Sequence, residues 1–389
     1  IGLTLSGGID LFTNDFDLTV DGLVQVSDPN TNLIVGGANS QLEIDNLTIN
    51  NGADVEIDGG VIRLDIQPNA SLVDINAGGE ILGHGTLRVA DILGVVTTQI
   101  INDGTITAQR SPLVIFGTPQ VGTLLLVASD DDARIDLDGA GETGSVIVRR
   151  NQTLDIDIPL ADIFNGTIDM FHDTTLDMSS AWIMGANATL DIDNGATGGF
   201  PAVAAGTSTI AGASFSQNSG TITLVDADGT VQFDAPFTMN GGDFVANGHV
   251  ICNANATIGA GANFTRPTSS SDITVEAGNT LTINQANFDL DGFLTTETVL
   301  TVNGRASLIA NLGDYDPDQV TNSYSSTINL NNGDMSVNTG DPQFVMNGVL
   351  NMHSSVVGQI TTWTGEAFHL GNDSVVLDSD LNVTGTQQT

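Results

Sequence analysis

Carboxylates at alternate positions in turn-rich segments are the side chains of this sequence that could most readily do chemistry. Asp314, Asp316 and Asp318 form the densest such cluster. Carboxylate oxygens gathered by a loop are ligands that Ca²⁺ prefers, so this spacing predicts a calcium site. The clusters lack the complete spacing of an EF-hand loop and of the calcium-binding nonapeptide repeat. Two shorter candidate sites consist of Asp226 with Asp228 and of Asp289 with Asp291.

The histidines and the cysteine form no recognisable catalytic or zinc motif. The five His are separated along the chain, and no Gly-x-Ser-x-Gly segment lies near any of them. A single cysteine, Cys252, excludes an intramolecular disulfide, and the absence of paired His spacing disfavours zinc. We therefore expect no catalytic residue and no required cofactor, with calcium as the candidate ion.

The charge balance excludes several classes of partner. The 389 residues include 8 basic and 47 acidic ones, which gives a net charge of −39, and none of the basic residues is Lys. Nucleic-acid binding needs clustered Lys and Arg against phosphate, and an anionic membrane would repel this chain. Chemistry that depends on a lysine, including isopeptide cross-links, is impossible.

Composition nevertheless indicates a folded chain made of strands and turns. Hydrophobic residues make up 40% and charged residues only 14%, so this is not a solvated acidic tail. The 45 Gly and the many Asn, Asp, Thr and Ser favour turns and strands over helices. No stretch approaches the roughly 18 apolar residues of a membrane-spanning helix, so we expect no membrane span.

A short pattern that recurs along the chain predicts the fold. A small residue, usually Gly, precedes Thr or Ser, and apolar residues follow two and four places after the small one. Residues two apart point to the same face of a strand. The anchors Gly85, Gly104, Gly122, Gly144 and Gly166 are separated by 19, 18, 22 and 22 residues. A strand that repeats at this interval is typical of a stacked repeat architecture.

We therefore predict an all-β protein, a right-handed parallel β-helix (β-solenoid) with rungs of about 18–22 residues. Inward positions would carry Ile, Leu, Val and Phe, and outward positions Thr, Asp, Asn and Ser. Residues 1–389 would form one continuous solenoid, with an enlarged loop rich in Gly, Ala, Ser and Thr at 195–219. A row of β-sandwiches is the alternative, disfavoured because the repeat is far shorter than a sandwich.

Several rungs resemble those of known extracellular solenoids. The segments 47–53 (LTINNGA), 81–87 (ILGHGTL) and 101–107 (INDGTIT) look like rungs of bacterial autotransporter passenger domains and of filamentous-haemagglutinin-type adhesins. The resemblance implies an exported prokaryotic protein, extracellular or at the cell surface, that serves as an adhesin or a structural element. It is specific for the fold and much less so for the function.

Polysaccharide lyases and hydrolases use the same solenoid, so an enzyme is the first alternative. Gly83-His84-Gly85 is similar to the Gly-His-Gly of polygalacturonase-type enzymes. The paired Asp and the Arg-Ile-Lys segment of that family have no counterpart in this sequence. A carbohydrate- or receptor-binding tail spike is the second alternative.

The ends of the sequence suggest how the protein could assemble. Segments 1–5 and 375–383 alternate like rung strands, and we identify no capping element beside them. Either the rungs continue in a longer rod, or neighbouring copies cover them. We therefore expect a homopolymer built by end-to-end contacts, as a subunit of a fibre, sheath or surface layer. A carbohydrate or another cell-surface molecule is a further expected partner.

Overall fold

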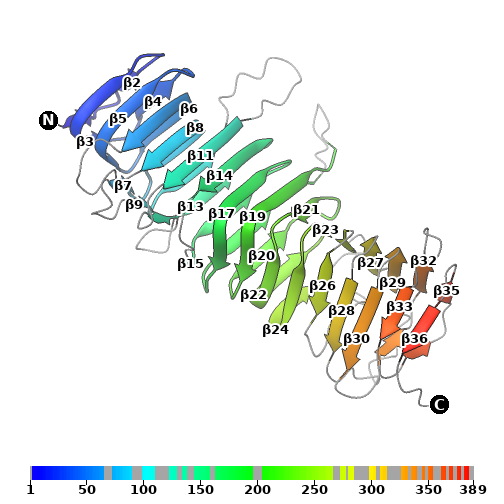
Figure 1. The fold of residues 1–389 in the computed structure, drawn as a ribbon. Helices are drawn as coiled ribbons and strands as arrows, with labels where there is room; N and C mark the ends of the chain where they lie inside the picture. Colours follow the sequence, from blue (N-terminus) through cyan, green and yellow to red (C-terminus); the bar gives the residue numbers. More distant parts are fainter. Residues whose placement is uncertain are drawn as a thin grey trace. The chain divides into compact units, whose positions relative to one another are not determined.

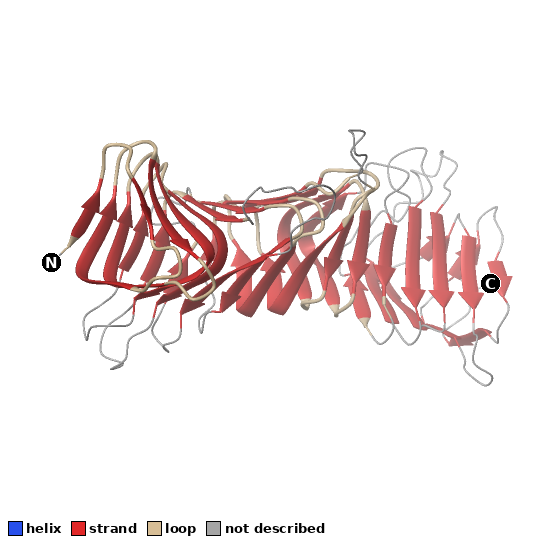
Figure 2. Ribbon diagram, turned by 90° about the horizontal axis from the view of Figure 1, so that it is seen from above, coloured by secondary structure: helices blue, strands red, loops and turns tan. Residues whose placement is uncertain are grey.

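The protein is described by a computed structural model in which every regular element among the described residues is a β-strand. The described residues are 2–64, 72–89, 99–109, 122–128, 134–137, 144–157, 163–195, 204–265, 272–276, 279–283, 298–303, 307–312, 326–331, 334–339, 344–346, 349–353, 361–364, 368–370, 375–377 and 381–384. Among them there are strands and turns but no helix (Figure 2). It follows that none of the described residues belongs to a helix able to cross a membrane.

The chain divides into two compact units, and each is a parallel β-solenoid. Unit 1 comprises Ile1–Ile192 and Ser208–Ser214, and unit 2 comprises Asp193–Thr207 and Phe215–Thr389. A typical rung has about 23 residues, close to the predicted length, so the predicted fold class is confirmed. The handedness of the coil and its continuity over residues 1–389 stay predictions.

Unit 1 contains three stacks of parallel strands, and Figure 1 shows successive strands following one another along the unit. The first stack contains β2 (Asp10–Phe12), β4 (Thr31–Gly36), the first halves of β6 (Ala53–Leu64) and β8 (Glu80–Val89), β10 (Thr105–Ala108), β13 (Ser145–Val148), β16 (Thr167–Met170) and β18 (Thr189–Ile192). The second contains β1 (Leu3–Leu5), the second halves of β3 (Leu18–Val26) and β5 (Gln41–Ile49), β7 (Leu72–Ile75), β9 (Gln99–Asn102) and β12 (Arg134–Asp136). The third contains the first halves of β3 and β5, the second halves of β6 and β8, β11 (Gly122–Ala128), β14 (Gln152–Asp157) and β17 (Thr175–Met184), and β15 (Ile163–Phe164) pairs with the end of β17.

Unit 2 repeats the arrangement with shorter strands. One stack contains β21 (Thr230–Phe233), β23 (His249–Cys252), β25 (Asp272–Val275), β27 (Thr298–Asn303), β29 (Ser326–Asn331), β32 (Val349–His353) and β35 (Val375–Leu377). A second contains β22 (Phe237–Ala246), β24 (Ala256–Thr265), β26 (Thr280–Ile283), β28 (Ser307–Leu312), β30 (Asp334–Thr339), β33 (Thr361–Thr364) and β36 (Leu381–Thr384). In addition, β20 (Thr221–Leu224) pairs with the end of β22, and β31 (Phe344–Met346) pairs with β34 (Phe368–Leu370).

The alternation of apolar and polar residues decides which side chains are buried. In β14, Leu154 and Ile156 are buried, whereas Asp155 and Asp157 face outward, as the pattern predicts. Parallel register then stacks like side chains on successive rungs, so that Leu154 lies opposite Leu176 of β17. Inner ladders of this kind supply the burial that stabilises each rung.

Aromatic rings pack together inside the first rungs of unit 2. Phe233 and Phe237 stack with ring centroids 4.4 Å apart, and Phe215 lies 5.5 Å from Phe237. Phe244 meets Phe237 edge-on at 6.2 Å. These rings adopt the stacked and edge-on geometries that aromatic pairs prefer. The cluster is therefore a continuous aromatic core that spans neighbouring rungs.

Asparagine side chains tie successive turns together in unit 1. Asn76 Nδ2 donates a hydrogen bond to Asn50 Oδ1 at 3.2 Å, and Asn50 Nδ2 donates to Ser27 Oγ at 2.8 Å. Each residue sits directly after a strand of the second stack. The turns are thus linked rung to rung by side chains as well as by the backbone, which explains the high Asn content of the turns.

Residues 195–219 do not all belong to the enlarged loop that we expected there. Strand β19 occupies Thr207–Gln217 within that range, and residues 196–203 lie outside the described residues. Ser208, Ile210, Phe215 and Gln217 are buried. Ser208 is tolerated inside because its Oγ donates to the carbonyl of Phe171 at 2.9 Å. Small polar residues that typically indicate a loop therefore form a strand here, because the backbone of a neighbouring rung satisfies them.

Candidate functional site

The densest group of ionisable side chains lies on the outer face of β6 and β8 in unit 1. Asp54, Glu56 and Asp58 occupy alternate positions of β6, and Asp54 lies directly opposite Glu80 of β8. Partial burial raises the pKa of Asp54, and the nearby charge of Glu80 raises it further. Burial also raises the pKa of Glu56, with additional contributions from Asp58 and Asp54. The geometry is a row of carboxylates that repel one another at neutral pH.

Carboxylates face each other between rungs elsewhere in unit 1. Asp169 of β16 lies opposite Asp191 of β18, and burial followed by the charge of Asp191 raises the pKa of Asp169, which the charge of Arg149 partly opposes. Burial and the charge of Asp103 raise the pKa of Asp74 in the same way, while a hydrogen bond from Asn76 lowers it. The pair Asp169–Asp191 therefore follows from the register, whereas Ile101 lies opposite Asp74 and Asp103 lies just after β9.

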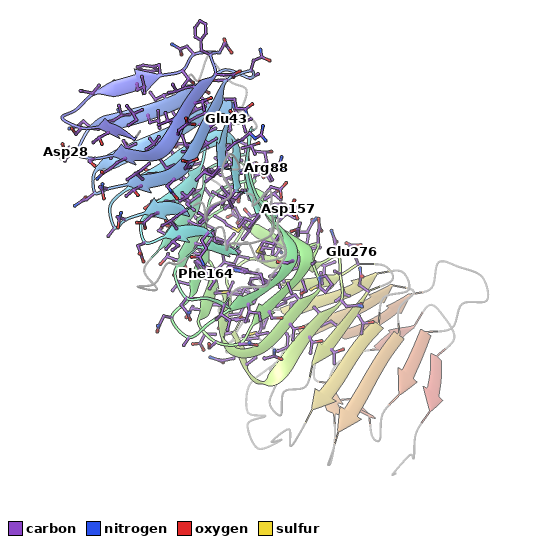
Figure 3. The ribbon with its side chains drawn as sticks, turned by 60° about the vertical axis from the view of Figure 1, so that its left-hand side comes forward. Asp28, Glu43, Arg88, Asp157, Phe164 and Glu276 are labelled. Atoms are coloured by element: carbon purple, nitrogen blue, oxygen red, sulfur yellow. The ribbon has the colours of Figure 1, made fainter. Side chains whose placement is uncertain are left out.

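Two of the arginines are neighbours in the third stack. Arg63 of β6 lies directly opposite Arg88 of β8. Arg63 Nη1 lies 3.8 Å from Glu43 Oε1, and Gln41 Nε2 donates to the same carboxylate oxygen at 2.6 Å. The Nε of Arg88 is buried and has no hydrogen-bond partner in the described part of the chain. Figure 3 shows Glu43, Arg88 and Asp157 following one another along one side of unit 1.

The Gly-His-Gly segment lies at a bend between the two halves of β8. His84 Nδ1 is 3.6 Å from Asp58 Oδ1, the carboxylate at the facing position of β6. Gly83 has a φ of 128°, and a Cβ at this position would overlap the carbonyl oxygen of Ile57. The two glycines therefore allow a backbone conformation with positive φ at a corner where adjacent rungs approach too closely for a side chain. This geometry accounts for the segment without any catalytic role for His84.

The predicted calcium ligands fall into two groups. Asp226 Oδ2 accepts a hydrogen bond from the backbone N–H of Gly195 at 2.9 Å, and Asp228 is exposed in the same turn. No cluster of three or more His, Cys, Asp or Glu side chains able to hold a metal occurs within the described ranges. The remaining candidates lie outside the described residues: Asp289, Asp291, Asp314, Asp316 and Asp318.

Cys252 points into the core of unit 2. The thiol is buried, and burial raises its pKa to about 12. A thiol with so high a pKa is neutral at physiological pH and a poor nucleophile. Cys252 is therefore a small core residue of unit 2.

The chain was also compared with known proteins. No protein-family model matches it, and no curated protein or solved structure is significantly similar to it. Any statement about function therefore rests on the residues and their arrangement.

The pairing of side chains between rungs is not part of the repeat pattern from which the fold was predicted. Arg63 and Arg88 are 25 positions apart, as their register shows, and each lies between two apolar residues, in Ile-Arg-Leu and Leu-Arg-Val. Aligning these two short segments would have placed the arginines side by side. The sequence gives no comparable signal for Asp54 and Glu80, because their neighbours differ.

Proposed function

We propose that this chain is an extracellular structural or adhesive protein of a prokaryotic cell surface, and a subunit of a fibre, sheath or surface layer. The supporting observation is the outer surface of unit 1, where rows of polar and acidic side chains repeat from rung to rung. A surface of this kind suits repeated contacts along a rod better than one concave site.

The stacked backbone suits a mechanical role. Neighbouring rungs are joined by parallel hydrogen-bonded pairing in each stack, and the apolar ladders exclude water between them. Separating two rungs would break several backbone hydrogen bonds and expose part of the core. Such an element resists bending and extension without any cofactor.

Exposed apolar side chains on the first described rungs support end-to-end contacts. Phe16 is 75% exposed, Ile9 55% and Phe12 50%, and Leu23 is also exposed. Strand β1 pairs with β3, and strand β2 pairs with β4. Among the described residues, neither β1 nor β2 pairs with a strand on its other edge. Large exposed apolar side chains favour burial against another apolar surface, and we propose that a neighbouring copy supplies that surface.

Negative-stain imaging of concentrated protein, with and without a calcium chelator, tests this proposal. We expect filaments in the unmodified protein and loss of filaments in Phe12→Asp combined with Phe16→Asp. Val225→Asp is the matched control, since Val225 is 45% exposed but lies in unit 2. Monodisperse particles at every concentration, or filaments unaffected by the double substitution, would overturn the end-to-end arrangement. Filament spacing that changes with the chelator would support a role for calcium in screening the negative charge.

A further inference from the structure

The turn between β3 and β4 contains an Asp–Pro peptide bond with a strained backbone. Asp28 has a φ of 79°, and Pro29 follows it directly. Positive φ is unfavourable for a residue with a Cβ, and a following proline ring restricts its neighbour further to extended conformations with negative φ. Asp28 and Pro29 are exposed, and Figure 3 shows Asp28 at the edge of the first rungs. Water therefore has access to this bond.

The corresponding turns of the next two rungs lack this combination. The N–H of Asn30 donates to the carbonyl of Gly52 at 3.1 Å, and the N–H of Gly52 donates to the carbonyl of Gly78 at 2.8 Å, so the three turns are stacked. Gly52 and Gly78 supply the positive φ of their turns, which glycine adopts without strain. Among these three turns, only the first joins a positive φ to a following proline.

Contacts with residues around the turn hold both sides of the bond. The N–H of Gly7 donates to Asp28 Oδ2 at 3.1 Å, and the N–H of Thr31 donates to the carbonyl oxygen of Asp28 at 3.3 Å. The ring of Pro29 lies so close to Gly52 that a Cβ added there would be 3.1 Å from Pro29 Cγ. The fold therefore keeps the bond in its strained conformation, and the N–H of Thr31 polarises the carbonyl group.

We propose that the protein cleaves its own chain between Asp28 and Pro29 in mild acid. The side-chain carboxyl of Asp28 attacks the carbonyl carbon of the same residue and closes a cyclic anhydride. The bond from that carbon to the nitrogen of Pro29 breaks, and the carboxyl proton moves to the nitrogen. Water then opens the anhydride, which restores the side chain of Asp28, leaves a C-terminal carboxyl on this residue, and makes Pro29 a new N-terminus.

The residue types and the strain both favour this reaction. The Asp side chain places its carboxyl where it can close a small ring on its own carbonyl carbon, and the tertiary amide nitrogen of proline is a better leaving group than an ordinary amide nitrogen. Strain that is present in the folded chain and released as the bond lengthens lowers the barrier. Among the described residues, the Asp28 carboxylate accepts a hydrogen bond only from Gly7 and forms no ion pair.

Cleavage would leave both parts of the chain in place. Strand β3 pairs with β5, and β2 pairs with β4, so each pair joins strands from opposite sides of the cut. The fragment 1–28 therefore stays attached to unit 1 until the fold is denatured. The reaction goes beyond the proposed function, because it needs neither a fibre nor a second copy.

Mass spectrometry of the full chain after incubation tests the proposal. We expect fragment 1–28 to accumulate at about pH 4.5, where a part of the Asp side chains is protonated, and not at pH 7. Cleavage should be at least roughly tenfold faster in the folded protein than in urea at the same pH, because unfolding releases the strain. Circular dichroism verifies that the protein without urea remains folded.

Other bonds of the same chain serve as internal references. The sequence contains two more Asp–Pro bonds, at 316–317 and 341–342, and in urea all three should be cleaved at similar rates. The bond between Asp15 and Phe16 also follows an exposed Asp with positive φ, 63°, but lacks the proline. It should stay intact in the folded protein. Equal cleavage at this bond would overturn the role given to Pro29.

A substitution identifies the attacking group. Asp28→Asn should abolish cleavage, because Asn tolerates positive φ but has no carboxyl group to attack. Asp15→Asn is the matched control and should leave cleavage after Asp28 unchanged. The cleaved protein should elute as one particle in size-exclusion chromatography and separate into two chains in urea. Cleavage that is no faster in the folded protein than in urea would overturn the inference. Persistence of cleavage in Asp28→Asn would overturn it as well.

Discussion

Asp155 lies directly opposite Asp177 in the parallel pairing of β14 with β17, so two carboxylates face each other on neighbouring rungs. Burial raises the pKa of Asp155, and the charges of Asp177 and Asp157 raise it further. Asp54 with Glu80 and Asp169 with Asp191 repeat this relationship in the first stack. The register that places apolar side chains opposite each other in the core therefore also places like charges opposite each other on the outer face. Their repulsion destabilises the folded state at neutral pH.

The first prediction is that mild acidification stabilises unit 1. A carboxyl with a higher pKa in the folded chain than in the unfolded chain binds protons more readily when folded. Protonation therefore favours the folded state as the pH falls through the raised pKa values towards the ordinary values of 3.8 for Asp and 4.5 for Glu. The added stability is lost again as the pH rises through the raised values. Thermal unfolding measured between pH 7 and about pH 4.5 should show a midpoint that rises on acidification.

A single substitution isolates this effect. Asp155→Asn removes one charge from the pair with Asp177 and should raise the free energy of unfolding at pH 7 by roughly 0.2–1 kcal/mol. The gain should vanish at low pH, where Asp155 is protonated in the unmodified protein. Asp17→Asn is the control, because Asp17 is exposed and outside these pairs. A midpoint that falls steadily from pH 7 downward would contradict the prediction.

The second prediction concerns the aromatic core of unit 2. Phe233 is fully buried and contacts Phe215, Phe237 and Phe244. Phe233→Ala should leave a cavity and cost about 3–5 kcal/mol, because β-solenoid rungs on both sides prevent complete collapse. Hydrogen exchange of the unit 2 strands measures the local loss of stability. A local measurement is appropriate because a repeat protein need not unfold in one step. Phe16→Ala, at a position 75% exposed, should change exchange little.

The fold could be predicted from the sequence because the deciding signal is local. Leu154 and Ile156 alternate with Asp155 and Asp157, and that alternation alone predicts which side chains are buried. Gly-Thr-apolar segments likewise predict where strands begin. Repetition of such segments without helical periodicity then predicts a solenoid.

Register could not be predicted, because it depends on which strands are neighbours in space. Gly85 and Gly104 carry the same local pattern, but Gly85 precedes a strand half of the third stack and Gly104 a strand of the first. The series of Gly anchors therefore combines strands of two stacks. Charge pairs such as Asp54 with Glu80, whose flanking residues differ, are visible only once the stacks are separated.

The third prediction concerns Gly83, at the bend of β8. Gly83→Ala places a Cβ on the carbonyl oxygen of Ile57 in the adjacent rung, at a φ of 128°. Both the overlap and the strained backbone are unfavourable, so we expect the free energy of unfolding to fall by roughly 3 kcal/mol or more, at or above the upper end of what strain alone costs. Gly7→Ala is the matched control, because Gly7 also has a positive φ but has no atom within 4 Å of an added Cβ. If chemical denaturation shows the same decrease in the free energy of unfolding for Gly83→Ala and Gly7→Ala, the overlap at Gly83 does not destabilise the fold.

The fourth prediction separates a structural role for Asp226 from a role in calcium binding. Asp226→Ala removes the acceptor of the Gly195 N–H, and Gly195 is buried, so the donor loses its partner. The free energy of unfolding should fall by about 1–3 kcal/mol.

Because this hydrogen bond needs no metal, the loss on Asp226→Ala should be the same with added Ca²⁺ and with a chelator. Asp228→Ala should cost less, because Asp228 is exposed. Isothermal titration of Ca²⁺ into the unmodified protein provides the second arm. A loss on Asp226→Ala that appears only with Ca²⁺ present would instead identify Asp226 as a calcium ligand.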